Sequence, residues 1–150
     1  MKNTALFPGS FDPFTKGHMD IVLRGTALFD EIIIGMGINT TKQRYFQIDY
    51  MIPKIEEAFK EYPKVKVMPY EGLTAMFAKK IDARFLIRGL RNTTDFEYEN
   101  TIAQVNRIQW KELETVFLIT DPSLAYISSS IVRDLHKYGA DVRDFLPYSI

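Results

Sequence analysis

Two spacings of apolar residues alternate along the chain. Short runs rich in Ile, Val, Phe and Leu, without polar residues at alternate positions, predict strands covered on both faces. These runs span residues 4–7, 31–38, 65–68, 85–87 and 116–119. Between them, stretches with helical spacing predict helices at residues 19–29, from about 51 to 59, at 74–81, from 94 to about 110, and at 130–138.

Local signals predict some helix ends and leave one open. The second helix has an apolar stripe, but Pro53 belongs in a first turn whereas Ile48 also fits the same helix. Thr94 and Glu97 form a capping box that predicts the start of the fourth helix. Gly139 follows the last helix and predicts a left-handed cap.

Strand–helix repeats of about 30 residues, about five in all, imply a particular fold. Right-handed crossovers of this kind produce an α/β fold with a Rossmann-like, open, parallel, five-stranded sheet and helices on both faces. No linker or low-complexity tract interrupts residues 1–150, so a single domain is expected. Such sheets bind ligands beyond the carboxyl ends of their strands, which directs attention to the residues that follow each strand.

Composition narrows the function classes. The 19 basic and 19 acidic residues cancel, which argues against a nucleic-acid partner held by phosphate-backbone electrostatics. The absence of cysteine excludes a disulfide framework and a thiolate nucleophile, and two histidines are too few for a His-rich zinc cluster. The start of the chain has no secretory signal and residues 32–38 form the longest apolar stretch, so no membrane segment and a cytoplasmic location are expected.

The segment after the first strand has the residues of an anion site. Gly9 allows close approach to a ligand, Ser10 offers a hydroxyl, and Gly17 clears the start of a helix whose N–H groups face outward. His18 adds a donor beside them. The simpler alternative is a plain strand–helix loop with a histidine packed against the sheet.

Two arginines surround a glycine directly after the fourth apolar run. The charges of Arg88 and Arg91, on either side of Gly89, are costly next to an apolar strand unless an anion binds the guanidinium groups. The planar fork of a guanidinium suits phosphate. The alternative is an intramolecular ion pair with Glu97 or Glu99, and both interpretations can hold, one for each arginine.

Three consecutive serines, Ser128 to Ser130, stand at a predicted helix start and form a second, hydroxyl-rich anion site. One of them is also expected to be the N-cap. Lys42 follows the second strand, where a solvated loop lysine is the simpler interpretation. His136 is interpreted as a partner of the helix dipole, and Trp110 as a core or subunit contact.

These segments resemble those of a known family. Residues 15–18 match the Thr/His-x-Gly-His motif of nucleotidylyltransferases, and residues 127–133 resemble their second motif. Residues 7–13 follow a start that is widespread in that superfamily. The more restrictive combination is Ile-Arg-Gly-Leu-Arg at 87–91 with Asp-Phe-Glu-Tyr-Glu at 95–99, which resembles the phosphopantetheine adenylyltransferases over nearly the whole chain.

The resemblance implies an activity and its partners. It implies Mg²⁺-dependent transfer of AMP from ATP to 4′-phosphopantetheine, which yields dephospho-coenzyme A and pyrophosphate in coenzyme A biosynthesis. Mg²⁺ would be held mainly by the ATP phosphates, with no metal ligand expected from the protein. The resemblance further implies a homo-oligomer, a hexamer, in the cytoplasm.

The resemblance also implies roles residue by residue. Lys42 and Arg88 would hold the phosphopantetheine phosphate together with Ser10, and Thr74 would contact the pantetheine arm through its backbone. His18, Lys42 and Arg88 are the expected catalytic residues. The expected ATP site consists of Ser10, Phe11, His18, Gly89, Leu90, Arg91, Glu99, Leu124, Ala125, Tyr126, Ile127, Ser128, Ser129 and Ser130.

Some positions depart from the family pattern. Ser10 stands where threonine is common, which keeps the hydroxyl. Residues 39–41 lack a frequent proline and residues 47–50 replace the usual helix start, which affects the geometry near Lys42. Leu124 replaces an aromatic residue and changes the expected packing of adenine.

Because the attacking phosphate is already an anion, the expected mechanism is positioning and charge stabilisation without a protein nucleophile. The nearest alternatives are a nicotinamide-mononucleotide adenylyltransferase and a cytidylyltransferase for an alcohol phosphate. The arginine segment at 88–91 and the acidic segment at 95–99 argue against both. A catalytically silent nucleotide sensor is an alternative of another class, which the presence of His18, Lys42 and Arg88 disfavours.

Overall fold

The chain alternates strands and helices from end to end in the computed structural model, which describes residues 1–150. None of its helices has the length and apolar character needed to cross a membrane. In chain order the elements are β1 (Thr4–Gly9), α1 (Lys16–Gly25), β2 (Glu31–Ile38), α2 (Ile48–Ala58), β3 (Val65–Glu71), α3 (Thr74–Lys80), β4 (Phe85–Leu90), α4 (Thr93–Gln109), β5 (Glu114–Ile119) and α5 (Ser129–Lys137), with short 3₁₀ turns at Pro122–Leu124 and Arg143–Phe145.

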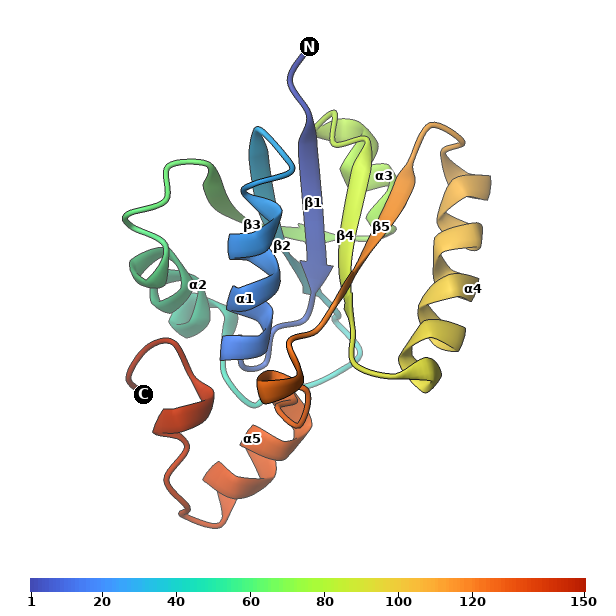
Figure 1. The fold of residues 1–150 in the computed structure, drawn as a ribbon. Coiled ribbons are helices and arrows are strands. Elements are labelled where there is room, and N and C mark those ends of the chain that lie inside the picture. Colours follow the sequence, from blue (N-terminus) through green and yellow to red (C-terminus); the bar gives the residue numbers. More distant parts are fainter.

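The five strands form one parallel sheet in the order β3-β2-β1-β4-β5 (Figure 1). This order confirms the predicted Rossmann-like sheet. The chain moves outward from β1 to β3 and then returns to β4 on the other side of β1, so the strand order reverses between β1 and β4. A crevice for ligands is expected at that point, beyond the carboxyl ends of the two strands.

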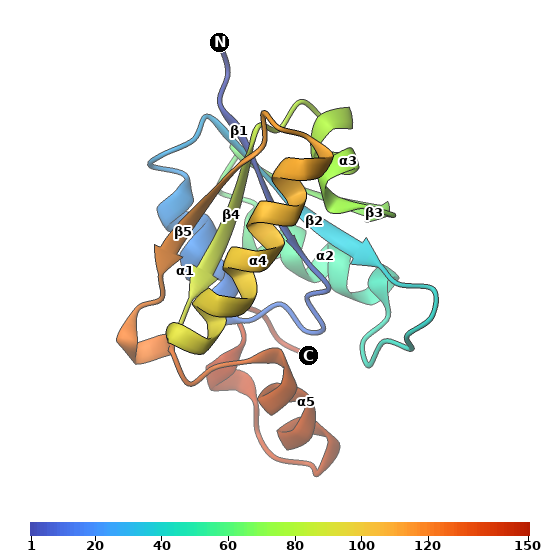
Figure 2. The same cartoon turned by 90° about the vertical axis from the view of Figure 1, so that its right-hand side faces the viewer.

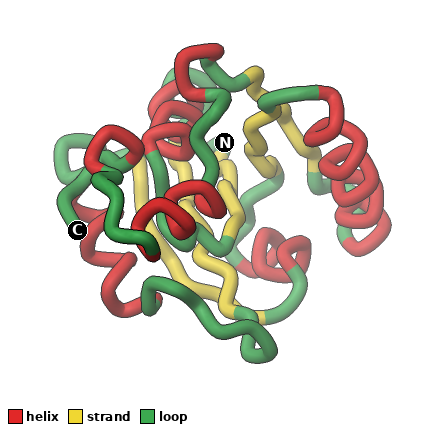
Figure 3. The backbone as a smooth tube through the Cα atoms, turned by 90° about the horizontal axis from the view of Figure 1, so that it is seen from below, coloured by secondary structure: helices red, strands yellow, loops and turns green.

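Helices cover both faces of the sheet, as predicted (Figures 2 and 3). Ala5 and Phe7 of β1 belong to the core cluster that α1 and α2 share with the sheet. The intervening Leu6 packs instead with Ala75 and Phe77 of α3 on the opposite face. Because side chains alternate along a strand, apolar residues at consecutive positions fill two separate cores. α5 lies beyond the carboxyl ends of the strands (Figure 1).

The strands extend further than the apolar runs. β4 continues to Leu90, so Arg88 and Gly89 lie within the strand, whereas the prediction placed them after it. β1 likewise continues through Pro8 and Gly9. Backbone pairing to neighbouring strands carries on here through residues that no apolar pattern marks.

The prediction that all five strands are covered on both faces is wrong for the edges. β3 alternates between half-buried and exposed side chains, and β5 is half-buried or exposed throughout. Both are edge strands with a neighbour on only one side. The inner strands β1 and β2 are buried nearly throughout, in agreement with the prediction.

Three helices begin earlier than predicted because their N-caps lie ahead of the predicted first residues. α1 begins at Lys16 with Thr15 as its N-cap, and α5 at Ser129 with Ser128 as its N-cap. α4 is capped by Asn92, whose Oδ1 accepts a hydrogen bond from the Asp95 amide, and not by the predicted box at Thr94.

The open question about α2 is settled in favour of Ile48 as its first residue. Pro53 therefore lies inside the helix, where it cannot donate the hydrogen bond that an amide at that position would give. Gly139 takes a φ of +80°, which confirms the predicted left-handed cap of α5. The Ala140 amide bonds to the Leu135 carbonyl and the Gly139 amide to that of His136, which together form a Schellman motif.

Candidate active site

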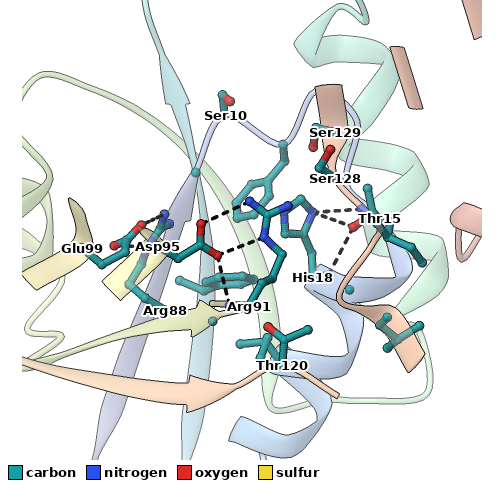
Figure 4. Close-up of a pocket in the computed structure, with 18 residues that line it drawn as sticks. Ser10, Thr15, His18, Arg88, Arg91, Asp95, Glu99, Thr120, Ser128 and Ser129 are labelled. Carbon is teal, nitrogen blue, oxygen red and sulfur yellow. Dashed lines mark hydrogen bonds and ion pairs between the residues drawn. The ribbon is translucent and has the colours of Figure 1, made fainter. Parts of the chain in front are cut away.

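Two cavities meet beyond the carboxyl ends of β1 and β4. The first, here the His18 cavity, has a volume of about 280 Å³ and lies between β4, the start of α1 and the start of α5 (Figure 4). The second, here the Thr74 cavity, has a volume of about 490 Å³ and lies between β1, β2, α3 and α4. The residues common to both walls are Gly9, Ser10, Arg88 and Glu99.

Most of the predicted site residues line these cavities although they come from distant parts of the chain. Thr74 lines the Thr74 cavity. Those that line the His18 cavity are Ser10, Phe11, His18, Arg88, Gly89, Arg91, Glu99, Leu124, Ile127, Ser128 and Ser129.

Five predicted residues lie outside both linings. Lys42 is exposed in the loop after β2, and Ser130 is exposed, with its hydroxyl accepting a hydrogen bond from Arg133. Leu90 is buried at the end of β4. Ala125 and Tyr126 follow the 3₁₀ turn, and the Tyr126 ring packs edge-on against Phe145.

A close turn carries Ser10 from the end of β1 to the wall that the two cavities share. A Cβ atom at Gly9 would lie 2.8 Å from the Phe11 ring, so only glycine fits there without a shift. Phe11 adopts a φ of +47°, in the left-handed region that non-glycine residues seldom occupy. Its ring is buried and lies against Phe7 and Phe14, and this packing holds the turn in place.

His18 is held by the cap of its own helix. Its Nδ1 accepts a hydrogen bond of 2.9 Å from the Thr15 amide, while its own amide donates to the Thr15 hydroxyl. The second nitrogen, Nε2, therefore carries the proton in the neutral ring. The rings of Phe7, Phe11 and Phe14 lie 5.0–6.1 Å from the imidazole between centroids.

Burial, reinforced by the positive charges of Arg88 and Arg91, lowers the pKa of His18 to about 3. An imidazole with a pKa far below 7 is neutral at physiological pH. It can therefore act as a hydrogen-bond donor to an oxyanion through Nε2 without first having to lose a proton.

Arg88 is oriented by three hydrogen bonds before any ligand binds. Its Nε and Nη2 bond to the two carboxylate oxygens of Glu99 at 2.9 and 2.6 Å, and Nη1 bonds to the Pro8 carbonyl. This is the ion pair with Glu99 considered from the sequence, whereas Glu97 takes no part. A guanidinium has five N–H groups, so one on each terminal nitrogen stays available on the wall shared by the two cavities.

Arg91 is paired in the same manner with Asp95. Its Nε lies 3.0 Å from Asp95 Oδ2, which also accepts from the Arg91 amide. This pairing lowers the pKa of Asp95, with the side-chain hydrogen bond from Arg91 as the largest cause. Both arginines thus form an ion pair and also line the His18 cavity. The ion-pair interpretation is confirmed for both, and anion binding by these residues stays a prediction.

The start of α5 uses part of its serine cluster for structure. The Ser128 hydroxyl accepts from the Ile131 amide, as expected of one serine. The Ser129 hydroxyl donates to the Pro13 carbonyl at 2.7 Å, which ties α5 to the loop after β1. The amides of the first helical turn still face outward and suit an anion.

Several lining residues were not among the predicted ligands. Gly9, Thr15 and Gly17 belong to the predicted anion loop, and Asp95 stands only four residues after Arg91, so an ion pair between these opposite charges could have been indicated. Thr120 directly follows β5, so strand ends alone could have indicated it. The other members of this set in the His18 cavity are Phe7 and Ile21.

No group of three or more His, Asp or Glu side chains gathers anywhere in the structure to hold a metal ion. The two carboxylates that line the cavities, Asp95 and Glu99, are both engaged by arginines. This donor set does not form a protein cage, but it fits a Mg²⁺ ion that is coordinated by nucleotide phosphates and water.

Known proteins resemble this chain along most of its length. Residues 6–135 match the family model described as cytidylyltransferase-like. A phosphopantetheine adenylyltransferase of Cytophaga hutchinsonii is 64% identical over 150 residues, which is 100% of both chains. A phosphopantetheine adenylyltransferase of Bacteroides thetaiotaomicron is 48% identical over 143 residues, which is 95% of this chain and 94% of the relative.

Among solved structures, a bifunctional NMN adenylyltransferase/ADP ribose pyrophosphatase from Francisella tularensis has a TM-score of 0.74 at 12% identity. The match covers 98% of this chain and 45% of that one, so this chain spans less than half of the bifunctional protein. At such low identity the likeness shows the fold alone. The two phosphopantetheine adenylyltransferases, at 64% and 48% identity, confirm the resemblance found in the sequence, and this chain belongs to the phosphopantetheine adenylyltransferases.

Proposed function

We propose that the protein transfers AMP from ATP to 4′-phosphopantetheine and releases dephospho-coenzyme A and pyrophosphate. The observation that carries this proposal is the shared wall between the two cavities. Ser10 and Arg88 face both of them, so a phosphate in one cavity and a phosphate in the other would meet at the same groups. A site for a single ligand would not need this arrangement.

On the nucleotide side, ATP would occupy the His18 cavity. Nε2–H of the neutral His18 ring would donate to an oxygen of the α-phosphate, where negative charge increases during transfer. The outward amides at the start of α5, next to Ser128 and Ser129, would hold the outer phosphates. Glycine at position 89 lets β4 pack closely on α1, since a Cβ atom there would lie 3.0 Å from the Ile21 side chain.

On the acceptor side, phosphopantetheine would lie in the Thr74 cavity with its phosphate at the shared wall. The two remaining N–H groups of Arg88 would bind this phosphate, and Lys42 would reach it from the loop after β2. An oxygen of the acceptor phosphate attacks the α-phosphorus, and the bond to pyrophosphate breaks. The attacking group is already anionic, so no side chain needs to remove a proton.

Mg²⁺ would be held mainly by the ATP phosphates, and when bound it would neutralise part of the charge on the leaving pyrophosphate. The protein's own contribution is to position both phosphates and to provide donors that are already oriented. The ion pair with Glu99 fixes the Arg88 fork, and the Thr15 cap fixes the His18 ring. Donors held in this way need little rearrangement when negative charge shifts between the phosphate oxygens during the transfer.

A direct test incubates the protein with ATP, Mg²⁺ and 4′-phosphopantetheine and detects the product by mass spectrometry. We expect dephospho-coenzyme A and an equal amount of pyrophosphate. Nicotinamide mononucleotide and glycerol 3-phosphate serve as alternative acceptors, and CTP as an alternative donor. Binding of ATP without turnover on any acceptor would instead support a nucleotide sensor, and transfer to nicotinamide mononucleotide alone would contradict the assigned acceptor.

We further propose that the protein is a homo-oligomer, a hexamer as in the family it belongs to. Supporting this, α4 exposes apolar side chains: Phe96, Val105 and Ile108 are 45%, 49% and 80% exposed. The Phe96 ring also packs edge-on against Phe117 of β5. Nearby, the buried Thr115 hydroxyl has no hydrogen-bond partner. A second copy packed on α4 would cover this apolar surface.

A further inference from the structure

Five consecutive carbonyl groups in the loop after β1 accept hydrogen bonds from side chains far away in the sequence. From Asp12 to Phe14, the donors come from α5 and the C-terminal segment. They are Arg133, Ser129 and Tyr148, at 2.7, 2.7 and 2.6 Å. The first two carbonyls, of Ser10 and Phe11, depend on one side chain from another region, Arg44.

Arg44 lies in the loop between β2 and α2, and its guanidinium joins two segments. Nη1 donates to the Ser10 carbonyl at 2.6 Å and Nη2 to the Phe11 carbonyl at 3.2 Å, while Nε donates to the Phe46 carbonyl at 2.8 Å. A planar fork with several donors can serve three acceptors at once, which an ammonium group cannot do with the same geometry. The carbonyls of Ser10 and Phe11 lie on either side of the Phe11 Cα, where φ takes its strained positive value.

Asp12 returns the contact in the opposite direction. Its two carboxylate oxygens accept from the amides of Tyr45 and Phe46, each at 2.7 Å. Asp12 is itself buried, so these bonds are shielded from water. The two loops are therefore joined by a reciprocal clasp, in which Arg44 holds the backbone of one loop and Asp12 holds the backbone of the other.

The clasp fixes one end of the segment that carries Lys42. The other end is a turn in which the Lys42 amide donates to the Asn39 carbonyl at 3.2 Å, and Asn39 lines the Thr74 cavity. Lys42 thus stands between a residue of the acceptor cavity and the residue that grips Ser10. Its side chain is exposed, and its backbone is anchored on both sides.

We infer that Arg44 is a positioning residue for the acceptor phosphate: it holds Ser10 and the Lys42 loop in register, so that both meet phosphopantetheine at the shared wall. This inference rests on the proposed function. Arg44 lines neither cavity, so it acts through Ser10 and Lys42 and touches no substrate itself. Loss of the clasp should therefore weaken the acceptor side much more than the nucleotide side.

The test compares the wild type with Arg44→Met, Arg44→Lys and the control Gln43→Met, which changes an exposed neighbour in the same loop. Initial rates are measured against each substrate while the other is saturating. For Arg44→Met we expect kcat/KM for phosphopantetheine to fall on the order of 10²-fold, as for a small misplacement of reacting groups. The KM for ATP should stay within about threefold. Apart from Ser10, the donors that line the His18 cavity, such as His18 and Arg91, make no contact with Arg44.

Arg44→Lys should give an intermediate loss, because it keeps the charge without the fork, and Gln43→Met should match the wild type. Millimolar guanidinium chloride should partly restore Arg44→Met. Equal losses toward both substrates, with Arg44→Lys as poor as Arg44→Met and no restoration, would overturn the inference in favour of a purely structural role. If circular dichroism shows Arg44→Met to be unfolded, Arg44→Lys carries the comparison by itself.

Calorimetry with phosphopantetheine separates this inference from the proposed function. The Kd should weaken in Arg44→Lys relative to the wild type, whether or not turnover occurs. A wild type that binds phosphopantetheine without turnover would contradict the proposed function and leave the Kd comparison to decide on Arg44. Unchanged Kd and KM values in both Arg44 variants would overturn the inference alone, and a wild type that does not bind phosphopantetheine would overturn both.

Discussion

His18 has one ring nitrogen committed to the helix cap and the other left to the cavity, and this division determines what the residue can do. In the proposed mechanism, replacement by alanine removes the donor to the α-phosphate oxygens but none of the amides that would hold the outer phosphates. We therefore expect His18→Ala to lower kcat roughly 10²-fold or more, with a much smaller change in the Kd for ATP. Steady-state rates and calorimetry measure the two effects, and an unchanged kcat would remove His18 from the chemistry.

The low pKa of His18 also predicts a pH dependence of stability. Between pH 6.5 and about 3 the unfolded chain binds a proton at this residue and the folded chain does not, so folding is weakened as the pH falls below 6.5. Relative to His18→Gln, the wild type should lose up to about 2 kcal/mol of unfolding free energy between pH 7 and pH 5.

Urea unfolding of both proteins at the two pH values, at one fixed protein concentration, measures this difference. If the wild type and His18→Gln lose the same unfolding free energy, the folded-state pKa of His18 is not depressed. The exposed His136 is present in both proteins and cancels in the comparison.

For single residues, the sequence predicted which side chains belong to the site better than it predicted their contacts. A strand end with Arg88 indicated an anion, and Glu99 was a named partner, because the spacing of charges is visible in sequence. Which residues hold the backbone of the loop after β1 was not visible. Arg44, Ser129 and Tyr148 lie 34, 116 and 134 residues from their acceptors, and only the folded chain brings them together.

Among the elements, α4 offers the clearest comparison between two capping assignments. The structure assigns the N-cap to Asn92, whereas the sequence pattern favoured Thr94, and both side chains are exposed. Asn92→Ala should reduce the unfolding free energy by about 1 kcal/mol, because the Asp95 amide loses its acceptor. Thr94→Ala should have a much smaller effect, and chemical denaturation of the two variants measures both.

A larger loss for Thr94→Ala than for Asn92→Ala would show that the helix starts at the predicted capping box. The comparison also explains why element boundaries were harder to predict than the elements themselves. Apolar spacing identified every strand and helix. The helix starts, however, depend on hydrogen bonds from polar side chains, and the strand ends depend on backbone pairing with a neighbouring strand. Where a ladder partner exists, as for Gly89 and Leu118, a strand continues past its apolar run.

For the whole molecule, the exposed apolar face of α4 predicts that assembly depends on it. Ile108→Glu should shift the protein from a particle of about six times 17.4 kDa to smaller species, as measured by light scattering after size exclusion. Leu28→Glu is the control, because Leu28 is an exposed apolar residue beyond α1, on the opposite face of the sheet. A wild type that is already monomeric, or an Ile108→Glu variant that stays assembled, would contradict the proposal.

The sheet, its parallel direction and its two covered faces could be predicted because repeated strand–helix units leave few topologies open. The existence of two cavities that share one wall could not be predicted, since it depends on how the folded chain places side chains from β1, β4 and α4 around the reversal of strand order. The function itself came from a family pattern, whereas the shared wall of the two cavities supports the proposal of how two anions are brought together.

The isoleucines of the two cavities allow the central claim to be measured directly. Ile21 and Ile127 line the His18 cavity, and Ile38 and Ile102 line the Thr74 cavity. Methyl NMR of protein labelled at isoleucine can follow all four during separate titrations with ATP, phosphopantetheine and dephospho-coenzyme A. We predict that ATP shifts the first pair, phosphopantetheine the second, and dephospho-coenzyme A both pairs with a single Kd. Competition of ATP and phosphopantetheine for the same pair of methyl groups would contradict the two-cavity account.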